Sequence, residues 1–269
     1  MNIAFFGSSE FAVPSLIALK ASGYEISCVV TQPDRKKGRG LSLTVTPVKG
    51  LAQKNEVKIY QPLSINTPED IKFLKSLNAD LFVVMAYGQI LSPEVLNIPR
   101  ILAINAHASL LPKYRGAAPI NWALIKGEKK TGVTIMKMVE EMDAGPIILQ
   151  EGVDIRDEDT AITLEDELSR IAAGLIIEAI RSIEDNNYKL IPQPKEDVSF
   201  APKLKKEDGR INWNKSALEI SNLIRGCVGW PGAFSFYKDK RLKIIKARIS
   251  RLSLPVRQAG GHAVLRRNN

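Results

Sequence analysis

The sequence predicts an α/β protein in which an open, mostly parallel sheet is followed by a small β-rich domain. Short apolar runs alternate with amphipathic segments over residues 1–186, the pattern of a sheet with helices on both faces. The run LFVVMAYG at 81–88 is strand-like throughout, as expected of a parallel strand covered on both sides. Residues 187–213 are polar, contain prolines and lack periodicity, so they predict a linker. We place the domains at 1–188 and 207–269, joined by residues 189–206.

Each element follows from a local pattern. In 10–23 apolar residues recur at helical spacing, with Pro14 near the first turn, where a helix tolerates proline. Thr67, Pro68 and Glu69 form an N-terminal capping pattern for a helix at 67–80. Strands are expected at 1–7, 24–32, the end of 51–62, 81–88, 101–107, 132–138 and 146–155. Helices are expected at 10–23, the start of 51–62, 67–80, 118–128, 160–186 and 216–229, and two strands joined by a tight KDKR turn are expected within 232–252.

Composition excludes several classes of protein. The chain has 269 residues and no long uninterrupted apolar run, so no membrane span is expected. The N-terminus lacks the pattern of a secretory signal, and Cys28 and Cys227 are read as free thiols in a reducing cytoplasm. No cluster of cysteine and histidine has metal-ligand spacing, so no metal site is expected. FFGSSEF has one glycine where a dinucleotide-binding loop needs three, which argues against NAD.

Positive charge is concentrated in the last part of the chain. Residues 1–189 hold 21 Lys and Arg against 23 Asp and Glu, a balance of −2. Residues 190–269 hold 17 Lys and Arg against 6 Asp and Glu, a balance of +11. Such asymmetry is typical either of a nucleic-acid partner or of a solubilising basic surface.

His107 is one of only two histidines, and it stands two residues after Asn105 at the end of the strand at 101–107. Residues i and i+2 of a strand face the same side, and open α/β sheets bind ligands at the carboxyl ends of their strands. An amide can donate a hydrogen bond to an oxygen that gains negative charge, and an imidazole can transfer a proton near neutral pH. The alternative is a histidine whose hydrogen bonds are satisfied at the sheet edge.

A carboxylate that orients the imidazole is expected in the segment VEEMDAGPI. Asp143 follows the strand at 132–138 directly, and neighbouring strand ends would bring it to the rim that carries His107. Gly145 and Pro146 predict a tight turn after it. Glu140 and Glu141 are competing candidates, although consecutive carboxylates are typical of a solvated loop.

Two long motifs indicate a family. NAHASLLPKYRGAAPI at 105–120 and TGVTIMKMVEEMDAGPII at 131–148 resemble the signature of the folate-dependent formyltransferases. The resemblance runs from about residue 1 to about residue 250 and implies a Rossmann-like catalytic domain and an oligonucleotide-binding-like barrel. TQPDRKKGRG at 31–40 and the segment 211–234 resemble the members that act on charged initiator tRNA.

The resemblance implies a reaction and its residues. A formyl group would pass from 10-formyltetrahydrofolate to an amine, in these members the α-amino group of methionine on initiator tRNA, with no metal. Asn105, His107 and Asp143 would be catalytic. Asn105 and protonated His107 would stabilise the oxyanion, His107 would also take part in proton transfer, and Asp143 would fix the orientation and charge of His107. The folate would lie along Ser109, Leu110, Leu111 and Pro112, with Tyr87 and Gly88 near the pterin. The tRNA would be bound by Arg35, Lys36, Lys37, Arg39, Lys203, Lys205, Lys206 and Lys243, with Lys238, Lys240, Arg241, Lys246 and Arg248 extending the basic track.

The sequence departs from the family pattern at its end. A five-stranded barrel needs more residues than the roughly 42 that follow Cys227, counting strands of about 5–6 residues each. We therefore expect an altered or incomplete barrel after about residue 251, which leaves tRNA affinity open. Two alternatives keep part of this interpretation: a formyltransferase acting on a nucleotide-linked amino sugar or other small amine, and a non-catalytic RNA-binding protein on the same fold. We expect a cytoplasmic monomer.

Overall fold

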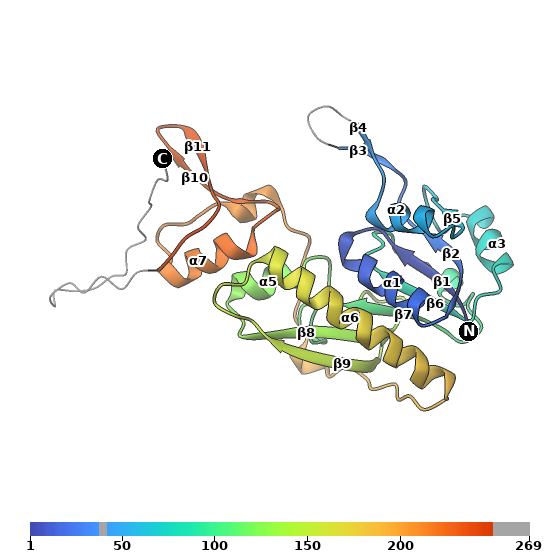
Figure 1. The fold of residues 1–269 in the computed structure, drawn as a ribbon. Coiled ribbons are helices and arrows are strands. Elements are labelled where there is room, and N and C mark those ends of the chain that lie inside the picture. The colour runs from blue at the N-terminus through green and yellow to red at the C-terminus, as the bar shows by residue number, and fades with distance from the viewer. Residues whose placement is uncertain (38–41, 250–269) are drawn as a thin grey trace. The chain divides into compact units, whose positions relative to one another are not determined.

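The computed structural model describes residues 1–37 and 42–249, and the contacts between Cα atoms divide the chain into two compact units. Unit 1 contains residues 1–115, 132–152 and 166–199; unit 2 contains residues 116–131, 153–165 and the chain from 200 onward. Figure 1 shows the fold as a ribbon, coloured along the chain from the N-terminus to the C-terminus. Each unit is described by itself below.

Unit 1 is built on a seven-stranded sheet in the order β5-β2-β1-β6-β7-β8-β9. The strands are β1 (Asn2–Gly7), β2 (Glu25–Val30), β5 (Ile59–Tyr60), β6 (Leu81–Met85), β7 (Leu102–His107), β8 (Lys130–Lys137) and β9 (Ile147–Asp154). The pairs β5–β2, β2–β1, β1–β6 and β6–β7 are parallel, and β7–β8 is antiparallel. The predicted open, mostly parallel sheet is therefore confirmed.

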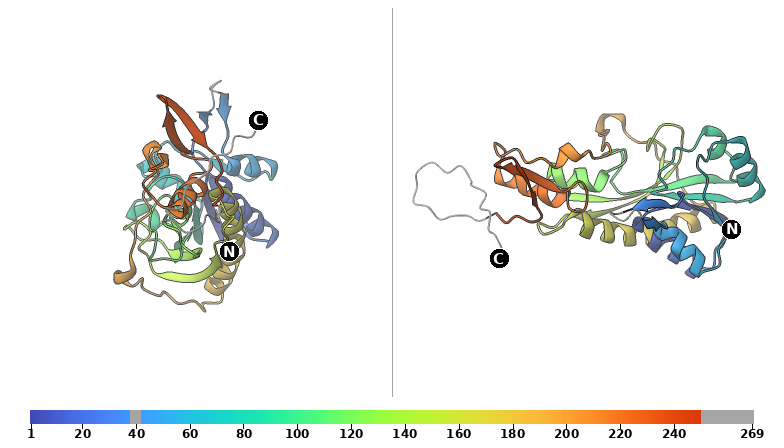
Figure 2. Two further views of the ribbon diagram at one scale, coloured as in Figure 1. Left: turned by 90° about the vertical axis from the view of Figure 1, so that its left-hand side faces the viewer. Right: turned by 90° about the horizontal axis from the view of Figure 1, so that it is seen from above.

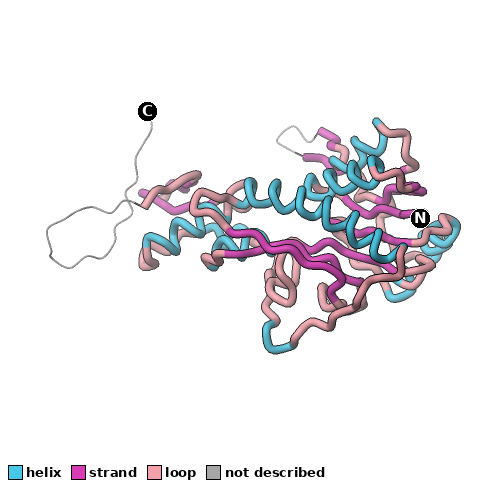
Figure 3. Tube along the Cα trace, turned by 60° about the horizontal axis from the view of Figure 1, so that its bottom comes forward, coloured by secondary structure: helices cyan, strands magenta, loops and turns pink. Residues whose placement is uncertain are grey.

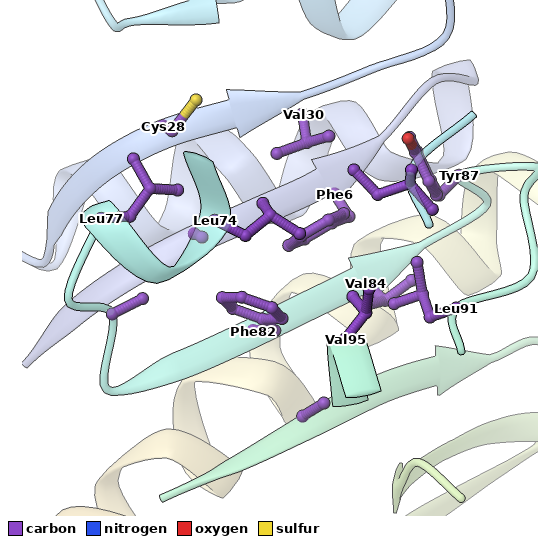
Figure 4. Close-up of a cluster of buried hydrophobic side chains, with 14 of the residues drawn as sticks. Phe6, Cys28, Val30, Leu74, Leu77, Phe82, Val84, Tyr87, Leu91 and Val95 are labelled. Atoms are coloured by element: carbon purple, nitrogen blue, oxygen red, sulfur yellow. The ribbon is translucent and has the colours of Figure 1, made fainter. Parts of the chain in front are cut away.

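Helices cover both faces of this sheet, as Figures 2 and 4 show: α3 and α4 lie on one face, and α1 and α6 on the other. The helices are α1 (Val13–Ala21), α2 (Pro47–Lys54), α3 (Pro68–Ser76), α4 (Pro93–Leu96) and α6 (Ala161–Glu184). The predicted cap at Thr67 is present, because its side chain accepts a hydrogen bond from the Asp70 backbone amide. Figure 3 shows α6 running beside the strands; no helix in the described part of the chain is long and apolar enough to cross a membrane.

The core between the sheet and the helices α3 and α4 is a cluster of buried apolar side chains (Figure 4). Phe6 and Phe82 come from adjacent strands, with ring centroids 4.8 Å apart. Leu74 enters the cluster from α3 and Val95 from α4, and both side chains are fully buried. This packing fixes the sheet whose carboxyl edge carries the candidate residues.

The basic segment at 31–40 contains the start of a hairpin that was not predicted. Strands β3 (Arg35–Lys37) and β4 (Ser42–Thr44) pair antiparallel, so this segment is not simply a loop. Lys36 and Lys37 lie in β3, whereas Arg39 lies outside the described residues.

Unit 2 packs two helices, α5 (Pro119–Lys126) and α7 (Ala217–Gly226), beside a hairpin of β10 (Ala233–Tyr237) and β11 (Lys240–Ile244). The Asn121 side chain donates to the Gly226 carbonyl at 2.8 Å. The two predicted strands joined by KDKR are confirmed, and Lys238 and Asp239 take the positive φ angles, 46° and 61°, of a tight hairpin turn. The expected alteration of the barrel after residue 251 lies outside the described residues.

Candidate active site

The site is built around the carboxyl end of β7. Ala103, Asn105 and His107 share one face of this strand because side chains alternate, and Ala103 belongs to the core cluster beneath α3 and α4. His107 is only 6% exposed, whereas Asn105 is half-buried. The Asn105 side chain makes no hydrogen bond to the described part of the chain, so its amide can serve a bound molecule.

His107 lies between two oxygen atoms. Its Nε2 is 2.9 Å from the carbonyl oxygen of Tyr114, and its Nδ1 is 3.6 Å from Oδ2 of Asp143. A carbonyl can only accept a hydrogen bond, so Nε2 carries a proton. A second proton on Nδ1 would face the Asp143 carboxylate, which is itself 14% exposed. The ring therefore lies between a carbonyl that accepts from Nε2 and a carboxylate that faces Nδ1.

Asp143 reaches His107 by a different route from the one expected. Strand β8 runs antiparallel to β7, so its carboxyl end, Lys137, pairs with Ile104 rather than with His107. The explanation from neighbouring strand ends is therefore wrong, because it assumed parallel strands. The loop after β8 instead carries Asp143 back to the imidazole, in a left-handed backbone conformation with φ of 53°.

The competing carboxylates lie elsewhere. Glu141 is 76% exposed and pairs with Arg115, whose Nη1 lies 3.2 Å from Glu141 Oε1. Glu140 is exposed. Asp143 is the carboxylate that the structure brings within 4 Å of the His107 ring.

Hydrogen bonds hold the loop after β7 to itself and to β8. The Ser109 hydroxyl, fully buried, donates to the Lys113 carbonyl at 2.6 Å. Thr134 of β8 donates to the Ser109 carbonyl and accepts from the Leu111 amide, at 2.7 and 3.1 Å. Among the predicted folate-binding residues, Ser109, Leu111 and Pro112 are buried and Leu110 is half-buried. Their hydroxyl and backbone groups thus mainly shape the loop.

Tyr87 and Gly88 lie just beyond β6. The Tyr87 side chain is 2% exposed and packs edge-on against Phe6, so it belongs to the core; burial raises the pKa of its hydroxyl. Gly88 is exposed and has a φ of 89°, a conformation that favours glycine. Nearby Gln32 has a buried Nε2 with no hydrogen-bond partner in the described residues, and it lies 3.7 Å from where a Cβ on Gly88 would be.

The predicted cations lie in both units. Arg35 is exposed and donates to the Gln32 side chain at 2.9 Å. Lys36 and Lys37 belong to β3. In unit 2 the exposed predicted residues are Lys203, Lys205, Lys206 and Lys243.

Sequence reasoning missed two residues close to Asp143. Arg115 is buried at 8% exposure, and Gln193 lies in the segment interpreted as a linker. The Gln193 Nε2 donates to the carbonyl oxygens of Asp143 and Gly145, at 2.9 and 2.7 Å. No pattern in a single sequence marks such a contact, because 50 residues separate Gln193 from Asp143.

Comparison with known proteins decides the family. A family profile described as formyl transferase matches residues 1–180, and one described as the formyl transferase C-terminal domain matches residues 203–266. The chain belongs to the formyl transferase family. The resemblance inferred from the two long motifs is thereby confirmed.

This formyl transferase has relatives of high identity. Methionyl-tRNA formyltransferase of Thermodesulfovibrio yellowstonii is 53% identical over 92% of this chain and 80% of its own length. The enzyme of the same name from Acetivibrio thermocellus is 48% identical over 91% of this chain and 78% of its own. A solved N-formyltransferase from Helicobacter canadensis, in complex with folinic acid and dTDP-3-aminofucose, is 24% identical with a TM-score of 0.70, over 92% of this chain and 87% of that one. The last comparison shows a shared fold.

Proposed function

We propose that this chain transfers the formyl group of 10-formyltetrahydrofolate to the α-amino group of methionine on initiator tRNA. One observation carries the choice of acceptor: relatives named methionyl-tRNA formyltransferase are 43–53% identical to this chain. The Asn105, His107 and Asp143 arrangement supplies the chemistry. In this proposal the chain acts as a cytoplasmic monomer, with residues 1–188 carrying the reaction and 207–269 binding tRNA through the connection at 189–206.

The groups near Gly88 fit a folate. The exposed backbone of Gly88 and the unpartnered Nε2 of Gln32 are polar groups that a pterin edge could pair with. We propose that Gly88, the backbone of Tyr87 and the loop from Ser109 to Pro112 line its site. When bound, the folate supplies an activated formyl group attached to nitrogen.

Three side chains then divide the work. As the amine of methionine attacks the formyl carbon, negative charge develops on the formyl oxygen, and Asn105 donates a hydrogen bond to it. Because the Nε2 proton of His107 is held by the Tyr114 carbonyl, Nδ1 is the ring nitrogen that can gain and release a proton. It takes the proton that the amine loses and passes it to the departing folate nitrogen as the carbon–nitrogen bond breaks. Asp143 stabilises the charged imidazole and fixes its orientation.

The basic residues give the chain a reason to bind a polyanion. Arg35, Lys36 and Lys37 of the β3–β4 hairpin, together with Arg39, would bind the acceptor arm of the tRNA. Exposed lysines of unit 2 would extend the contact with phosphates. Neither feature is needed for a small acceptor.

Formylation of methionyl initiator tRNA by the purified 269-residue chain tests the proposal. We expect formylmethionyl-tRNA to form, and a nucleotide-linked amino sugar to be a much poorer acceptor. Preference for the sugar would overturn the choice of tRNA. Replacing His107 with alanine should lower kcat by about 10²–10⁴-fold, the usual contribution of a positioned acid–base group, while tRNA binding persists. Salt-sensitive tRNA binding without turnover in the unmodified chain would instead favour the non-catalytic alternative.

A further inference from the structure

The segment 191–199, which we call the strap, crosses unit 1 beside both partners of His107. At one end Ile191 exchanges two backbone hydrogen bonds with Ile147 at the start of β9, at 2.8 and 2.9 Å. At the other end Ser199 bonds to the loop after β7: its hydroxyl accepts from the Tyr114 amide and its carbonyl accepts from the Arg115 amide, both at 2.9 Å. The strap is therefore tied to the sheet and to the loop that carries Tyr114.

Between these ends, the Gln193 side chain makes four hydrogen bonds. Its Oε1 accepts from Nε and Nη2 of Arg115, at 3.0 and 2.8 Å. Its Nε2 donates to the carbonyls of Asp143 and Gly145. The partners fix the orientation of the amide, because a guanidinium can only donate and a carbonyl can only accept.

The Gln193 hydrogen bonds reach a part of the Asp143 loop whose backbone is already restricted in conformation. Asp143 adopts a left-handed backbone conformation, which few residues other than glycine, asparagine and aspartate favour. Gly145 packs so closely on β8 that a Cβ there would lie 1.7 Å from the Lys137 carbonyl oxygen. The Gln193 amide binds the backbone carbonyls on both sides of Ala144, one of them that of Asp143 itself.

We propose that Gln193 is a positioning residue for formyl transfer, which acts through the backbone of Asp143 on the placement of the Asp143 carboxylate and so on the orientation of His107. Arg115 holds the Gln193 amide in place. Ser199 holds Tyr114, the other partner of the imidazole, through the hydrogen bond from the Tyr114 amide. The strap thus sets His107 from both sides. This inference rests on the proposed function for its kinetic consequences, but its geometric claim concerns His107 alone.

The kinetic test is a double-mutant cycle. Gln193→Met keeps the size of the side chain and removes its hydrogen bonds. We expect it to lower kcat by about ten- to a hundredfold, as a displaced catalytic group does, while KM for the charged tRNA changes little. In an Asp143→Asn background, Gln193→Met should change kcat by no more than about twofold, because the residue through which it acts is already disabled.

Asn2→Leu is the matched control. The Asn2 side chain likewise donates two hydrogen bonds to backbone carbonyls, those of Leu77 and Asn78 at 3.0 and 3.3 Å, but at the amino end of β1. It should lower the melting temperature as Gln193→Met does and leave kcat unchanged. Equal losses of kcat from Gln193→Met in both backgrounds, or no loss in either, would overturn the positioning role.

A spectroscopic readout keeps the test independent of the acceptor. The chain has two histidines, so imidazole ¹⁵N resonances of labelled protein are assigned with a His262→Gln variant. Gln193→Met should shift the His107 Nδ1 resonance, and Asn2→Leu should not. An unchanged resonance contradicts the positioning role even if the chain formylates nothing. An active unmodified chain with unaltered kcat in Gln193→Met contradicts the positioning role and leaves the proposed function standing.

Discussion

Asn105 is the side chain of the site whose polar atoms are left for a bound molecule. Its neighbours on the same face of β7 have contacts within the protein: Ala103 lies in the core, and His107 contacts the Tyr114 carbonyl through Nε2, which leaves Nδ1, 3.6 Å from Asp143, for proton transfer. A half-buried amide with no partner in residues 1–37 and 42–249 is expected to serve as a hydrogen-bond donor to an oxygen that gains charge.

Asn105→Ala should therefore lower kcat by about 10²–10³-fold, the loss seen when one such donor is removed. KM for either substrate should change little, because the bond strengthens only as the reaction proceeds. Asn105→Asp is the informative companion, since it keeps the shape and replaces the donor with an anion. Steady-state kinetics that show near-normal turnover in Asn105→Asp would rule out the donor role.

At this scale the sequence predicts pairs within one element better than pairs between elements. The spacing of Asn105 and His107 on one strand is enough to place them on one face, and they lie there. Asp143 also lies beside His107, but for a reason that strand order alone does not supply. The direction of β8 and the contact of Gln193 depend on tertiary packing between segments far apart in the chain, which local patterns do not encode.

Among the elements, the β3–β4 hairpin is anchored at both ends by a cluster of polar side chains around Asp34 and Thr46, which we call the polar cluster. Asp34, immediately before β3, accepts from Lys49 of α2 at 2.5 Å and from Gln61 at 2.8 Å. Thr46, just after β4, caps α2, and its hydroxyl lies 2.7 Å from the Thr31 hydroxyl. These bonds fix where both arms of the basic hairpin leave the sheet.

The polar cluster should make the free energy of unfolding fall as pH drops into the acidic range. Hydrogen bonds from Lys49 and then Gln61 lower the pKa of Asp34, so its contribution is fully present above the unfolded-state value of about 3.9 and is lost as pH falls through the lower folded value. Asp34→Asn should cost about 1–3 kcal/mol in the free energy of unfolding near neutral pH, since the Lys49 charge loses its partner. Urea titrations should show the gap between variant and parent closing only below about pH 3.9.

A control for this prediction is Asp157→Asn. Asp157 pairs with Lys129 at 3.1 Å, but the two side chains are 90% and 71% exposed. An exposed pair contributes between about 0 and 1 kcal/mol, so the control should be nearly neutral at every pH. Equal effects of the two substitutions would mean that the Asp34–Lys49 pair contributes no more to stability than an exposed ion pair.

Helix α3 illustrates how the sheet is held. Leu74 is fully buried against the strands, so Leu74→Ala removes apolar contacts and leaves a cavity (Figure 4). We expect a loss of about 2–5 kcal/mol in the free energy of unfolding, measured by urea denaturation. Leu63→Ala, at a position 91% exposed, should change it by less than about 0.5 kcal/mol.

Elements with a strong period or cap are those that the sequence predicts well. The apolar run of β6 and the Thr67 cap of α3 are confirmed because burial on both faces and capping leave local signatures. The short β3 and β4 were missed, since three-residue arms rich in charge have no apolar alternation. They form because the polar cluster around Asp34 and Thr46 holds the two ends of the segment together.

For the whole molecule, the concentration of positive charge fits either a nucleic-acid partner or a solubilising basic surface, and the relatives named methionyl-tRNA formyltransferase favour the first. The excess of positive charge in residues 190–269 belongs largely to unit 2, and the β3–β4 hairpin adds Arg35, Lys36 and Lys37 from unit 1. Phosphate contacts release counterions, so binding through these groups must weaken as salt rises. A small folate, by contrast, makes few such contacts.

Salt dependence therefore separates the two substrates. In steady-state assays, log KM for charged tRNA should rise steeply with log salt concentration, while KM for 10-formyltetrahydrofolate stays nearly flat. Replacing Arg35, Lys36 and Lys37 together with glutamine should raise KM for the tRNA at low salt and reduce its slope by about two to three, close to one for each cation that no longer binds a phosphate. Turnover at saturating tRNA should persist, because these cations are not part of the His107 site. A slope that is unchanged in this variant would mean that the hairpin does not contact phosphates and that the tRNA affinity comes from unit 2 alone.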